Sequence, residues 1–252
     1  MAEQSPAIIK VCGLGKEFRS SALFSRARVR AVWDLNFEVR RGEIFGFLGP
    51  NGAGKTTTLH LLTGISKPSA GSIELFGKAF RCPQTWPLER IGFVPENTLA
   101  SEYLTVTEIL TFFSRIYGLT DDVTIDRIQS LLEMTGLTQE RFVLVRKLSM
   151  GQRRLVDFML ALVNDPDIIF LDEPTVYLDP LAVERFREAV LILKNRGKTI
   201  FMSSHTLPLI EKLSDRIALI SKGRVLKIGE RQDFLRQGSM EEEFLRLIKE
   251  DR

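Results

Sequence analysis

The chain has 252 residues, of which 44% are hydrophobic and 27% are charged. This composition is that of a globular protein, long enough to bury a core as one large domain or one domain with a subdomain. A net charge of +3 is too small to indicate nucleic-acid binding by itself. We expect no signal peptide and no membrane helix, because no run approaches ~20 apolar residues. Cys12 and Cys82 lie far apart without ligand spacing, so we expect reduced thiols.

The first predicted elements come from two apolar patterns in the N-terminal third of the chain. Residues 33–39 alternate, and one face carries Trp33, Leu35, Phe37 and Val39. A period of two predicts a half-buried antiparallel strand. Residues 44–49 are a short apolar run, typical of a buried central strand. Residues 55–64 then predict a helix that Gly64 closes.

The middle of the chain, residues 98–165, has helix signals and no strand signals. Thr105 and Glu108 form a capping box before an amphipathic run, and a second helix ends at Gly136. A third helix is predicted from Ser149 to Asn164, where Pro166 stops it. These signals predict a helical subdomain.

Strand and helix patterns alternate in the last third of the chain. Residues 167–173 and 198–204 are apolar runs typical of buried strands, with a helix predicted over 181–197 between them. A hairpin is expected around Lys222 and Gly223, and a capped amphipathic helix from Ser239. Alternating units of this kind predict an α/β fold with a mostly parallel sheet.

Residues 49–56 fit the phosphate-loop pattern G-x-x-x-x-G-K-[ST], between a predicted strand and a predicted helix. Glycines let backbone amides close around phosphates, and the helix start attracts negative charge. Lys55 supplies a mobile positive charge, and the hydroxyl of Thr56 is a ligand for Mg²⁺. We expect the loop and the residue after it to hold ATP: Gly49, Pro50, Asn51, Gly52, Ala53, Gly54, Lys55, Thr56 and Thr57.

Two carboxylates end the strand predicted at 167–173. In parallel α/β sheets, ligands bind at the carboxyl ends of the strands. Asp172 is a candidate Mg²⁺ ligand, and Glu173 is a candidate to orient or deprotonate the attacking water. His205 ends the next strand and is a candidate donor to the γ-phosphate. We expect Lys55, Glu173 and His205 to be catalytic.

The stretch LSMGQRR, residues 148–154, lies between the phosphate loop and the acidic strand, and Ser149 precedes Asp172 by 23 residues. With this stretch at this spacing, the whole chain resembles the ATPase subunits of ATP-binding-cassette (ABC) transporters, in particular exporters. The resemblance implies a P-loop NTPase fold with an antiparallel β subdomain and an α-helical subdomain. It implies a single domain over 1–252, with a core lobe at 1–97 and 166–229, helical signature residues at 98–165 and C-terminal helices at 230–252.

The resemblance also implies site roles in a head-to-tail dimer with two ATP molecules and Mg²⁺ between the subunits. Ser149, Gly151 and Gln152 would contact the partner's nucleotide, and Asp179 would cross the interface. Glu96 stands where the family usually has a glutamine that touches Mg²⁺. Phe18 stands where an aromatic stacks on adenine, although Phe24 in the long following segment is a rival.

Three departures from the family pattern concern this site. Met150 replaces the first of two signature glycines, Glu96 replaces the glutamine, and Tyr177 replaces a glycine before Leu178 and Asp179. Met150 and Glu96 occur in exporter members, so they are not expected to abolish activity. They affect the expected fine geometry of the site and leave its class unchanged.

The implied partners are a second ABC ATPase subunit, identical or different, and separate membrane permease subunits, with no nucleic acid expected. Residues around Tyr103 would line the groove that receives a permease helix. The chain is therefore expected in the cytoplasm, peripheral on the inner face of the membrane, hydrolysing ATP to drive export. Two alternatives stay open: a nucleotide-sensing ABC module that gates a partner without transport, and a soluble ABC ATPase. The sequence does not predict the transported substrate.

Overall fold

The computed structural model describes residues 6–19, 28–80, 86–235 and 239–251. The chain divides into two compact units, one formed by residues 1–86 and 201–252 and the other by residues 87–200. No helix in the described part of the chain is both long and apolar enough to cross a membrane. Cys12 is a free, exposed thiol, and Cys82 lies outside the described residues.

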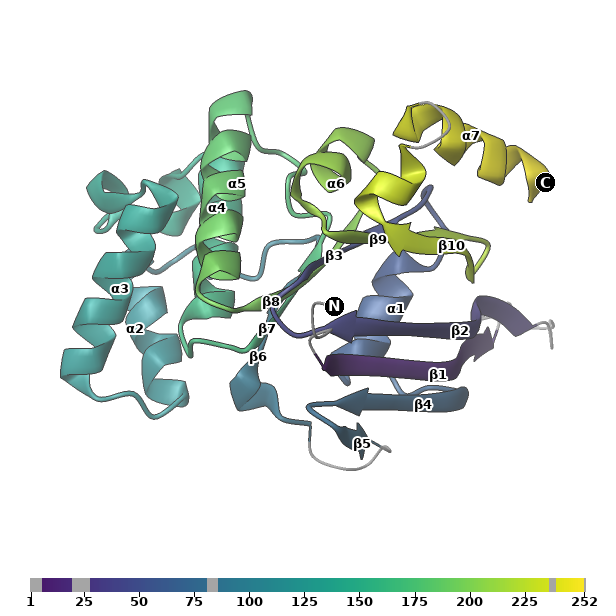
Figure 1. The fold of residues 1–252 in the computed structure, drawn as a ribbon. Coiled ribbons are helices and arrows are strands. Elements are labelled where there is room, and N and C mark those ends of the chain that lie inside the picture. Colours follow the sequence, from purple (N-terminus) through teal and green to yellow (C-terminus); the bar gives the residue numbers. More distant parts are fainter. Residues whose placement is uncertain (1–5, 20–27, 81–85, 236–238, 252) are drawn as a thin grey trace. The chain divides into compact units, whose positions relative to one another are not determined.

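The first unit contains an antiparallel sheet of four strands in the order β2-β1-β4-β5 (Figure 1). Alternation along the two long strands buries one face, including Ile9, Val11, Leu35 and Phe37. The half-buried antiparallel strand predicted at 33–39 is therefore present, within β2. The strands are β1 (Ala7–Arg19), β2 (Arg28–Arg40), β4 (Ala70–Leu75) and β5 (Lys78–Phe80).

Trp33 is the exception to the predicted alternation in β2. Its side chain is 43% exposed, while Val32 takes the buried position. The cause is a bulge: the register with β1 shifts between the pairs Leu14–Leu35 and Lys16–Val32, and Asp34 has a φ of 51°. An extra residue in one strand reverses the side-chain alternation beyond it. The prediction that Trp33 shares a face with Leu35 was wrong for this reason.

A second group of strands in the first unit has the order β10-β9-β3-β8, and β3 pairs with β9 in parallel. Every residue of β3 is buried, as its apolar sequence predicts. The rings of Phe37, Phe45, Phe47 and Phe201 stack or tilt against one another with centroids 5.2–5.9 Å apart. This aromatic core supports the strand that leads into the phosphate loop. The elements are β3 (Ile44–Leu48), α1 (Lys55–Leu62), β8 (Thr199–Ser204), α6 (Leu207–Leu213), β9 (Arg216–Ser221), β10 (Arg224–Glu230), a 3₁₀ turn (Arg231–Phe234) and α7 (Met240–Glu250).

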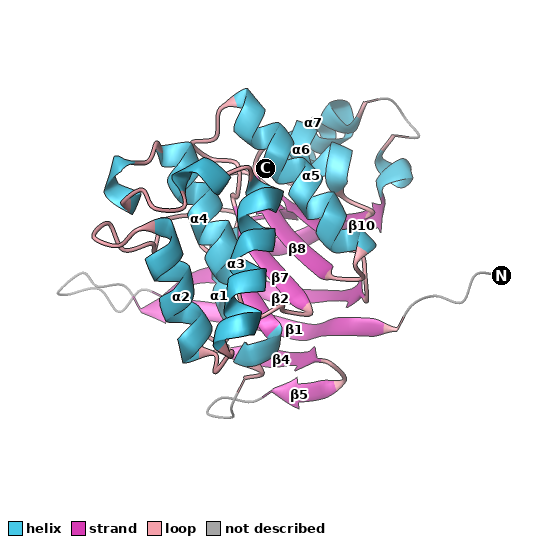
Figure 2. Cartoon of the chain, turned by 90° about the vertical axis from the view of Figure 1, so that its left-hand side faces the viewer, coloured by secondary structure: helices cyan, strands magenta, loops and turns pink. Residues whose placement is uncertain are grey.

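The second unit combines a parallel strand pair with four α-helices. Figure 2 draws its helices in cyan. The predicted capping box is present, because Thr105 Oγ1 accepts from Glu108 N and a carboxylate oxygen of Glu108 accepts from Thr105 N. The second predicted helix ends at Gly136, which has a left-handed backbone. The elements are β6 (Ile91–Val94), α2 (Val106–Ile116), α3 (Asp121–Thr135), α4 (Met150–Leu162), β7 (Ile168–Asp172), α5 (Pro180–Asn195) and 3₁₀ turns at Leu88–Arg90, Thr138–Glu140 and Val145–Lys147.

Candidate functional site

The phosphate loop joins the buried strand β3 to helix α1, as the sequence predicts. The buried Lys55 points back into the loop, where its Nζ donates to Gly49 O at 2.9 Å and Pro50 O at 3.2 Å. Helix α1 begins after Gly54 without a side-chain cap. The first amides of a helix have no partner within the helix and favour an anion there. The loop therefore has the donor set that a triphosphate requires.

Glycine occupies positions 52 and 54 of this loop for different physical reasons. Gly54 has a φ of 100°, and a Cβ there would lie 2.4 Å from Ala31 O, so backbone packing excludes a side chain. Gly52 has a φ of 78°, and a Cβ there would meet nothing within 4 Å. The space beside Gly52 thus leaves room for a ligand, and the residues present fit ATP.

The hairpin turn at Lys222 and Gly223 contacts the phosphate loop through a backbone hydrogen bond. Gly223 N donates to Ala53 O at 2.9 Å, and Gly223 O accepts from Trp33 N at 2.7 Å. The next residue, Arg224, lies over the Trp33 ring at 4.2 Å from its centroid. The turn therefore joins β2 to the loop through the backbone N–H and C=O of one residue, Gly223. The sequence predicted the hairpin and gave no sign of this contact.

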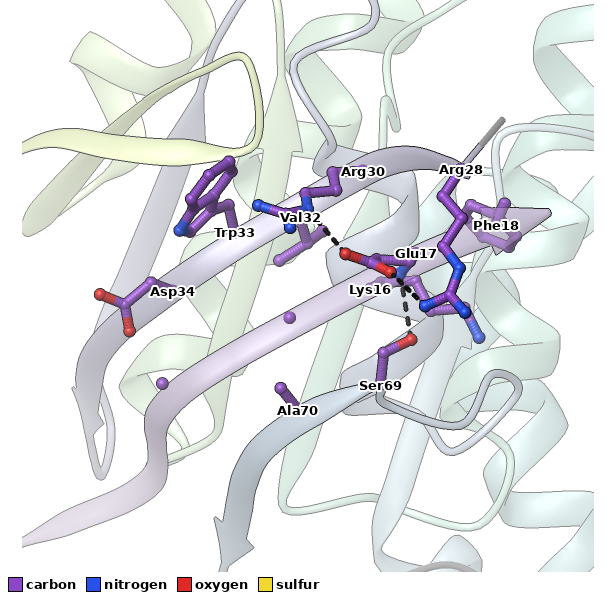
Figure 3. A pocket seen from close by; sticks show the side chains of 12 residues that line it. Lys16, Glu17, Phe18, Arg28, Arg30, Val32, Trp33, Asp34, Ser69 and Ala70 are labelled. Carbon is purple, nitrogen blue, oxygen red and sulfur yellow. Dashed lines mark hydrogen bonds and ion pairs between the residues drawn. The ribbon is translucent and has the colours of Figure 1, made fainter. Parts of the chain in front are cut away.

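Phe18, the predicted adenine-stacking residue, is exposed near the end of β1 and lines a hollow of about 660 Å³ (Figure 3). It pairs with Val29 across the sheet, two residues from Ala31, the residue whose carbonyl packs against Gly54. Two residues of a strand span ~7 Å, which is compatible with a nucleoside between the loop and the ring. No phosphate-loop residue lines the hollow itself. Phe24, the rival, lies outside the described residues.

Charged side chains along this hollow pair with one another. Glu17 accepts from Arg30 at 2.6 Å and from Arg28 at 3.2 Å, as Figure 3 shows. These hydrogen bonds, first from Arg30 and then from Arg28, hold the pKa of the Glu17 carboxyl below its ordinary value. The Lys16 ammonium lies 5.0 Å from the centroid of the Phe18 ring. This edge of the first unit therefore combines an exposed ring with neighbouring cations.

In the second unit, strand β7 ends at Asp172 and Glu173 follows it directly, and both carboxylates are buried. Glu173 has a φ of 45°, a left-handed conformation that is rare for a residue with a side chain and often marks a functional site. Among the described residues, no three His, Cys, Asp or Glu side chains gather closely enough to hold a metal ion alone. The buried Asp172 is nevertheless an oxygen donor of the type that Mg²⁺ takes with phosphates.

A residue that sequence reasoning missed lies beneath this strand end. Arg154 of α4 is buried and donates to the backbone carbonyls of Pro95, Asp172, Glu173 and Pro174. The only sequence signal is a pair of arginines after the signature stretch, which reads as an ordinary charged helix face. Its guanidinium connects the signature helix with the acidic strand end.

The signature stretch forms the start of α4. Ser149 is the N-cap: its Oγ accepts from Gln152 N at 3.1 Å, while its own N donates to Gln152 Oε1 at 3.0 Å. The Ser149 hydroxyl still has its own proton to donate to a ligand. Gln152 also donates to Glu140 at 3.0 Å, so both ends of its side chain make contacts within the chain. Met150 is 59% exposed at this helix start.

The segment before α5 lies beside the signature. A Cβ on Gly151 would lie 3.3 Å from Tyr177 O and 3.5 Å from Leu178 Cδ2, so the two backbones are in close contact. Asp179 is exposed and caps α5 by accepting from Ala182 N at 2.8 Å. Tyr177 is 61% exposed with a φ of 70°, a conformation that glycine adopts more readily. Met150 and Tyr177 thus add two large exposed side chains to one region.

The remaining candidates are placed within their own units. Thr56 and Thr57 are half-buried in the first turn of α1, and His205 is exposed just after β8 in the first unit. Glu96 is exposed just after β6 in the second unit. The ligand and catalytic roles of all these residues stay predictions.

The match to known proteins decides the family. The model of the ABC transporter family matches residues 32–176, which include the phosphate loop, the signature and the acidic strand end. This chain belongs to the ABC transporter family. It is 37% identical over 234 residues to an ABC transporter ATP-binding protein of Synechocystis sp., which covers 90% of this chain and 65% of that protein.

Two further relatives of this ABC protein are named for export or transport. It is 37% identical to the Nod factor export ATP-binding protein I of Ralstonia nicotianae, over 92% of this chain and 70% of that protein. It is 39% identical to the bacitracin transport ATP-binding protein BcrA of Bacillus licheniformis, over 87% of this chain and 69% of that protein. The chain thus spans about two thirds of the length of the curated relatives that it matches.

Solved structures confirm the predicted ABC ATPase fold. An ATP-binding subunit of an ABC transporter superposes with a TM-score of 0.80 at 28% identity, covering 96% of this chain and 99% of that one. A dimeric ATP-binding cassette bound to ADP and Pi superposes with a TM-score of 0.81 at 23% identity, covering 88% of this chain and 98% of that one. Mostly parallel strands, an antiparallel sheet and a helical part are common to the predicted and observed folds.

Proposed function

We propose that this ABC protein is the ATP-hydrolysing subunit of an exporter, working as a head-to-tail dimer with separate membrane permease subunits. The observation that carries the proposal is the combination, in one ABC chain, of a phosphate loop wrapped around Lys55 and a buried carboxylate strand end at Asp172 and Glu173. Export is favoured by the relatives named for Nod factor export and bacitracin transport.

Nucleotide binding in this proposal uses the residues predicted for it. The loop amides and Lys55 hold the phosphates, and Phe18 stacks on the adenine. Thr56, Glu96 and Asp172 would hold Mg²⁺, which would supply positive charge against the phosphates. The fit rests on the space beside Gly52, the uncapped start of α1 and the hard oxygen donors at these positions.

Hydrolysis in this proposal is an in-line attack of water on the γ-phosphorus, in which the bond to the β–γ bridging oxygen breaks, ADP leaves and the water proton passes to the released phosphate. Glu173 accepts a hydrogen bond from the attacking water and orients it, and His205 donates a hydrogen bond to a γ-phosphate oxygen. Lys55 stabilises the charge that develops on the transferred group. The strained backbone of Glu173 supports this role, because strain is retained where the position of a side chain matters.

The signature helix serves the nucleotide of the second subunit. Ser149 donates a hydrogen bond from its hydroxyl and Gly151 one from its amide to that γ-phosphate, since Ser149 at the start of α4 is exposed and a helix start favours an anion. Gln152 holds Ser149 through the capping box and lies beside the same phosphate. Asp179 reaches across the interface. ATP then joins the two subunits, and its hydrolysis loosens the dimer.

The test of enzymatic function is Mg²⁺-dependent release of phosphate from ATP by the purified chain, compared with the Glu173→Gln variant. We expect the wild type to turn over ATP and the variant to bind it without hydrolysis. Size-exclusion chromatography with ATP should then detect a stable dimer only for Glu173→Gln. A wild type that binds ATP without turnover, in detergent-solubilised membranes as well as alone, would favour the nucleotide-sensing alternative.

The permease contact is tested separately. Tyr103 is 78% exposed before α2, in the region proposed to receive a permease helix at the cytoplasmic face of the membrane. Tyr103→Asp should remove the chain from membrane fractions while its ATP affinity stays unchanged. If wild type and variant both stay in the soluble fraction of the native cells, the soluble-ATPase alternative is favoured.

A further inference from the structure

Arg154 is a charged residue with only 4% of its surface exposed, five residues after the N-cap Ser149 on helix α4. Its Nη2 donates to Asp172 O at 2.6 Å and Glu173 O at 3.3 Å, and its Nε to Pro174 O at 3.5 Å. Its Nη1 donates to Pro95 O. One side chain therefore holds three consecutive carbonyls at the end of β7 and a fourth beside Glu96.

Burying this cation is unfavourable by itself. Burial lowers the pKa of the Arg154 guanidinium, and the carboxylates of Asp157, Asp172, Glu96 and Glu173 oppose that shift. A buried charge is retained when hydrogen bonds satisfy it, and the planar guanidinium offers five donors in a fixed geometry. A guanidinium that donates to four carbonyls fixes their mutual positions more tightly than packing alone.

Three of the four carbonyls that Arg154 holds belong to a strained segment. Glu173 has a φ of 45° and Tyr177, four residues later, a φ of 70°. Between them, Val176 N donates to Glu173 O at 3.3 Å and Leu178 N to Thr175 O at 3.2 Å, the sparse bonds of an irregular turn. A strained conformation persists only where the surroundings over-determine it. The bonds from Arg154 are such a constraint on the backbone of Glu173.

We infer that Arg154 is a positioning residue that fixes the backbone at Glu173 and couples it to the signature end of α4. The inference rests on the proposed function, in which Glu173 orients water at one nucleotide and Ser149 contacts the other. Any shift of α4 when Ser149 engages the partner's nucleotide is then transmitted through one guanidinium to the water-orienting carboxylate. Arg154 also donates to Pro95, the residue before Glu96, so the backbone next to Glu96 and the backbone of Glu173 are both bonded to helix α4.

The first test measures the segment directly and needs no nucleotide. Hydrogen–deuterium exchange of the Val176 and Leu178 amides is compared in wild type, Arg154→Lys and Arg154→Met. We expect exchange at both amides to accelerate about tenfold or more, because local opening loses its main restraint. Lysine keeps the charge but cannot reach four carbonyls at once, so Arg154→Lys should show most of the effect.

The control for this test is Arg127→Met. Arg127 also joins a helix to α4, through Leu162 O at 3.5 Å and Asp165 at 3.3 Å, but at the opposite end of that helix. It should leave Val176 and Leu178 unchanged. The amide of Leu137, bonded to Leu132 O, reports general loosening of the unit. Unaltered exchange at 176 and 178 in Arg154→Lys, or equal acceleration at Leu137, overturns the inference.

The second test separates positioning from stability by kinetics. In Arg154→Lys, kcat should fall between about tenfold and hundredfold while the KM for ATP changes less than about threefold, since a misplaced group affects the transition state more than binding. A merely structural arginine would lower the melting temperature and leave kcat below that temperature unaltered. If the wild type itself lacks turnover, the proposed function fails while the exchange result still decides the role of Arg154.

Discussion

At the scale of single residues, Glu243 is a buried acid held between two cations. Its carboxylate accepts from Arg246 at 2.9 Å and from Lys227 at 2.8 Å, which ties α7 to β10. Hydrogen bonds from Arg246 and then Lys227 lower the pKa of Glu243 from 4.5 to about 2. Because the folded state favours the ionised form, this contact stabilises the protein at neutral pH.

The pH dependence of Glu243→Gln follows from this shift. The variant should unfold more easily than the wild type at pH 7, because glutamine has no charge to attract Arg246 and Lys227. The difference in free energy of unfolding should stay constant down to about pH 4.5 and then shrink toward about pH 2, as the wild-type carboxyl takes up a proton. Urea titrations at stepped pH measure it, with the exposed Glu241→Gln as the control that shows no such change. A difference that is independent of pH would contradict the assignment.

The residue types at the candidate site were predictable because their chemistry is local. A glycine loop before a helix, or two acids after an apolar run, requires no knowledge of the rest of the fold. Trp33 and Arg154 were not predictable in this way. A bulge set by pairing with β1 turns Trp33 outward, and only the tertiary fold places four carbonyls around Arg154.

At the scale of elements, the first unit contains two hairpin turns of the same kind. Phe76–Gly77 joins β4 to β5, and Lys222–Gly223 joins β9 to β10, each with two positive φ angles as in a type I′ turn. A Cβ on Gly77 would meet nothing within 4 Å, whereas a Cβ on Gly223 would lie 2.7 Å from Ala31 O. The two turns thus share the need for positive φ angles and differ in what surrounds them.

Gly223→Ala and Gly77→Ala form a matched pair for testing the support of the phosphate loop. Gly77→Ala should lower the free energy of unfolding by about 1 kcal/mol, the cost of a left-handed alanine, and Gly223→Ala by more, because its Cβ would also meet Ala31 O at 2.7 Å. Only Gly223→Ala should weaken binding of a fluorescent ATP analogue, by about tenfold, because the displaced turn no longer holds Ala53 O. Equal ATP affinity in the two variants would show that the turn does not position the loop.

Most elements were predictable from periodicity and end signals, including β3, α1, the capped α2 and the hairpin at Lys222. The contact of that hairpin with the loop was not, since residues 53 and 223 meet only through the tertiary fold. Strands β4, β5 and β6 are short and alternate weakly, so the sequence did not predict them. Local signals fix where an element is, and long-range packing decides what it supports.

At the scale of the whole molecule, the two helix starts predicted to contact phosphate are both within the described residues, one in each compact unit. Helix α1 has no side-chain cap, while α4 has the capping box of Ser149 and Gln152. A capped start still presents a hydroxyl proton and the Gly151 amide. In the proposed dimer, each nucleotide takes the first kind of helix start from one subunit and the second from its partner. The lobe boundaries suggested by the sequence stay a prediction.

Mixing two inactive variants tests this crossed arrangement. Lys55→Ala removes the ammonium from one phosphate loop, and Ser149→Arg blocks the signature that serves the other subunit. A mixed dimer then has one site with both defects and one site with neither. If the two sites act independently, an equal mixture should recover about a quarter of wild-type ATP turnover, because half of the dimers are mixed and each has one intact site.

The matched control mixes Lys55→Ala with Glu173→Gln. Both residues belong to the same subunit's half of a site, so each site of the mixed dimer has one defect and turnover should stay at background. Recovery in the first mixture and none in the second requires Ser149 to act on its partner's nucleotide, since a signature acting within its own subunit would leave both mixtures inactive. Recovery in neither mixture would contradict either the crossed geometry or the independence of the two sites. The ATP-dependent dimer of Glu173→Gln distinguishes these two explanations. If the geometry is crossed, this dimer should be lost when Ser149→Arg is added to the same chain.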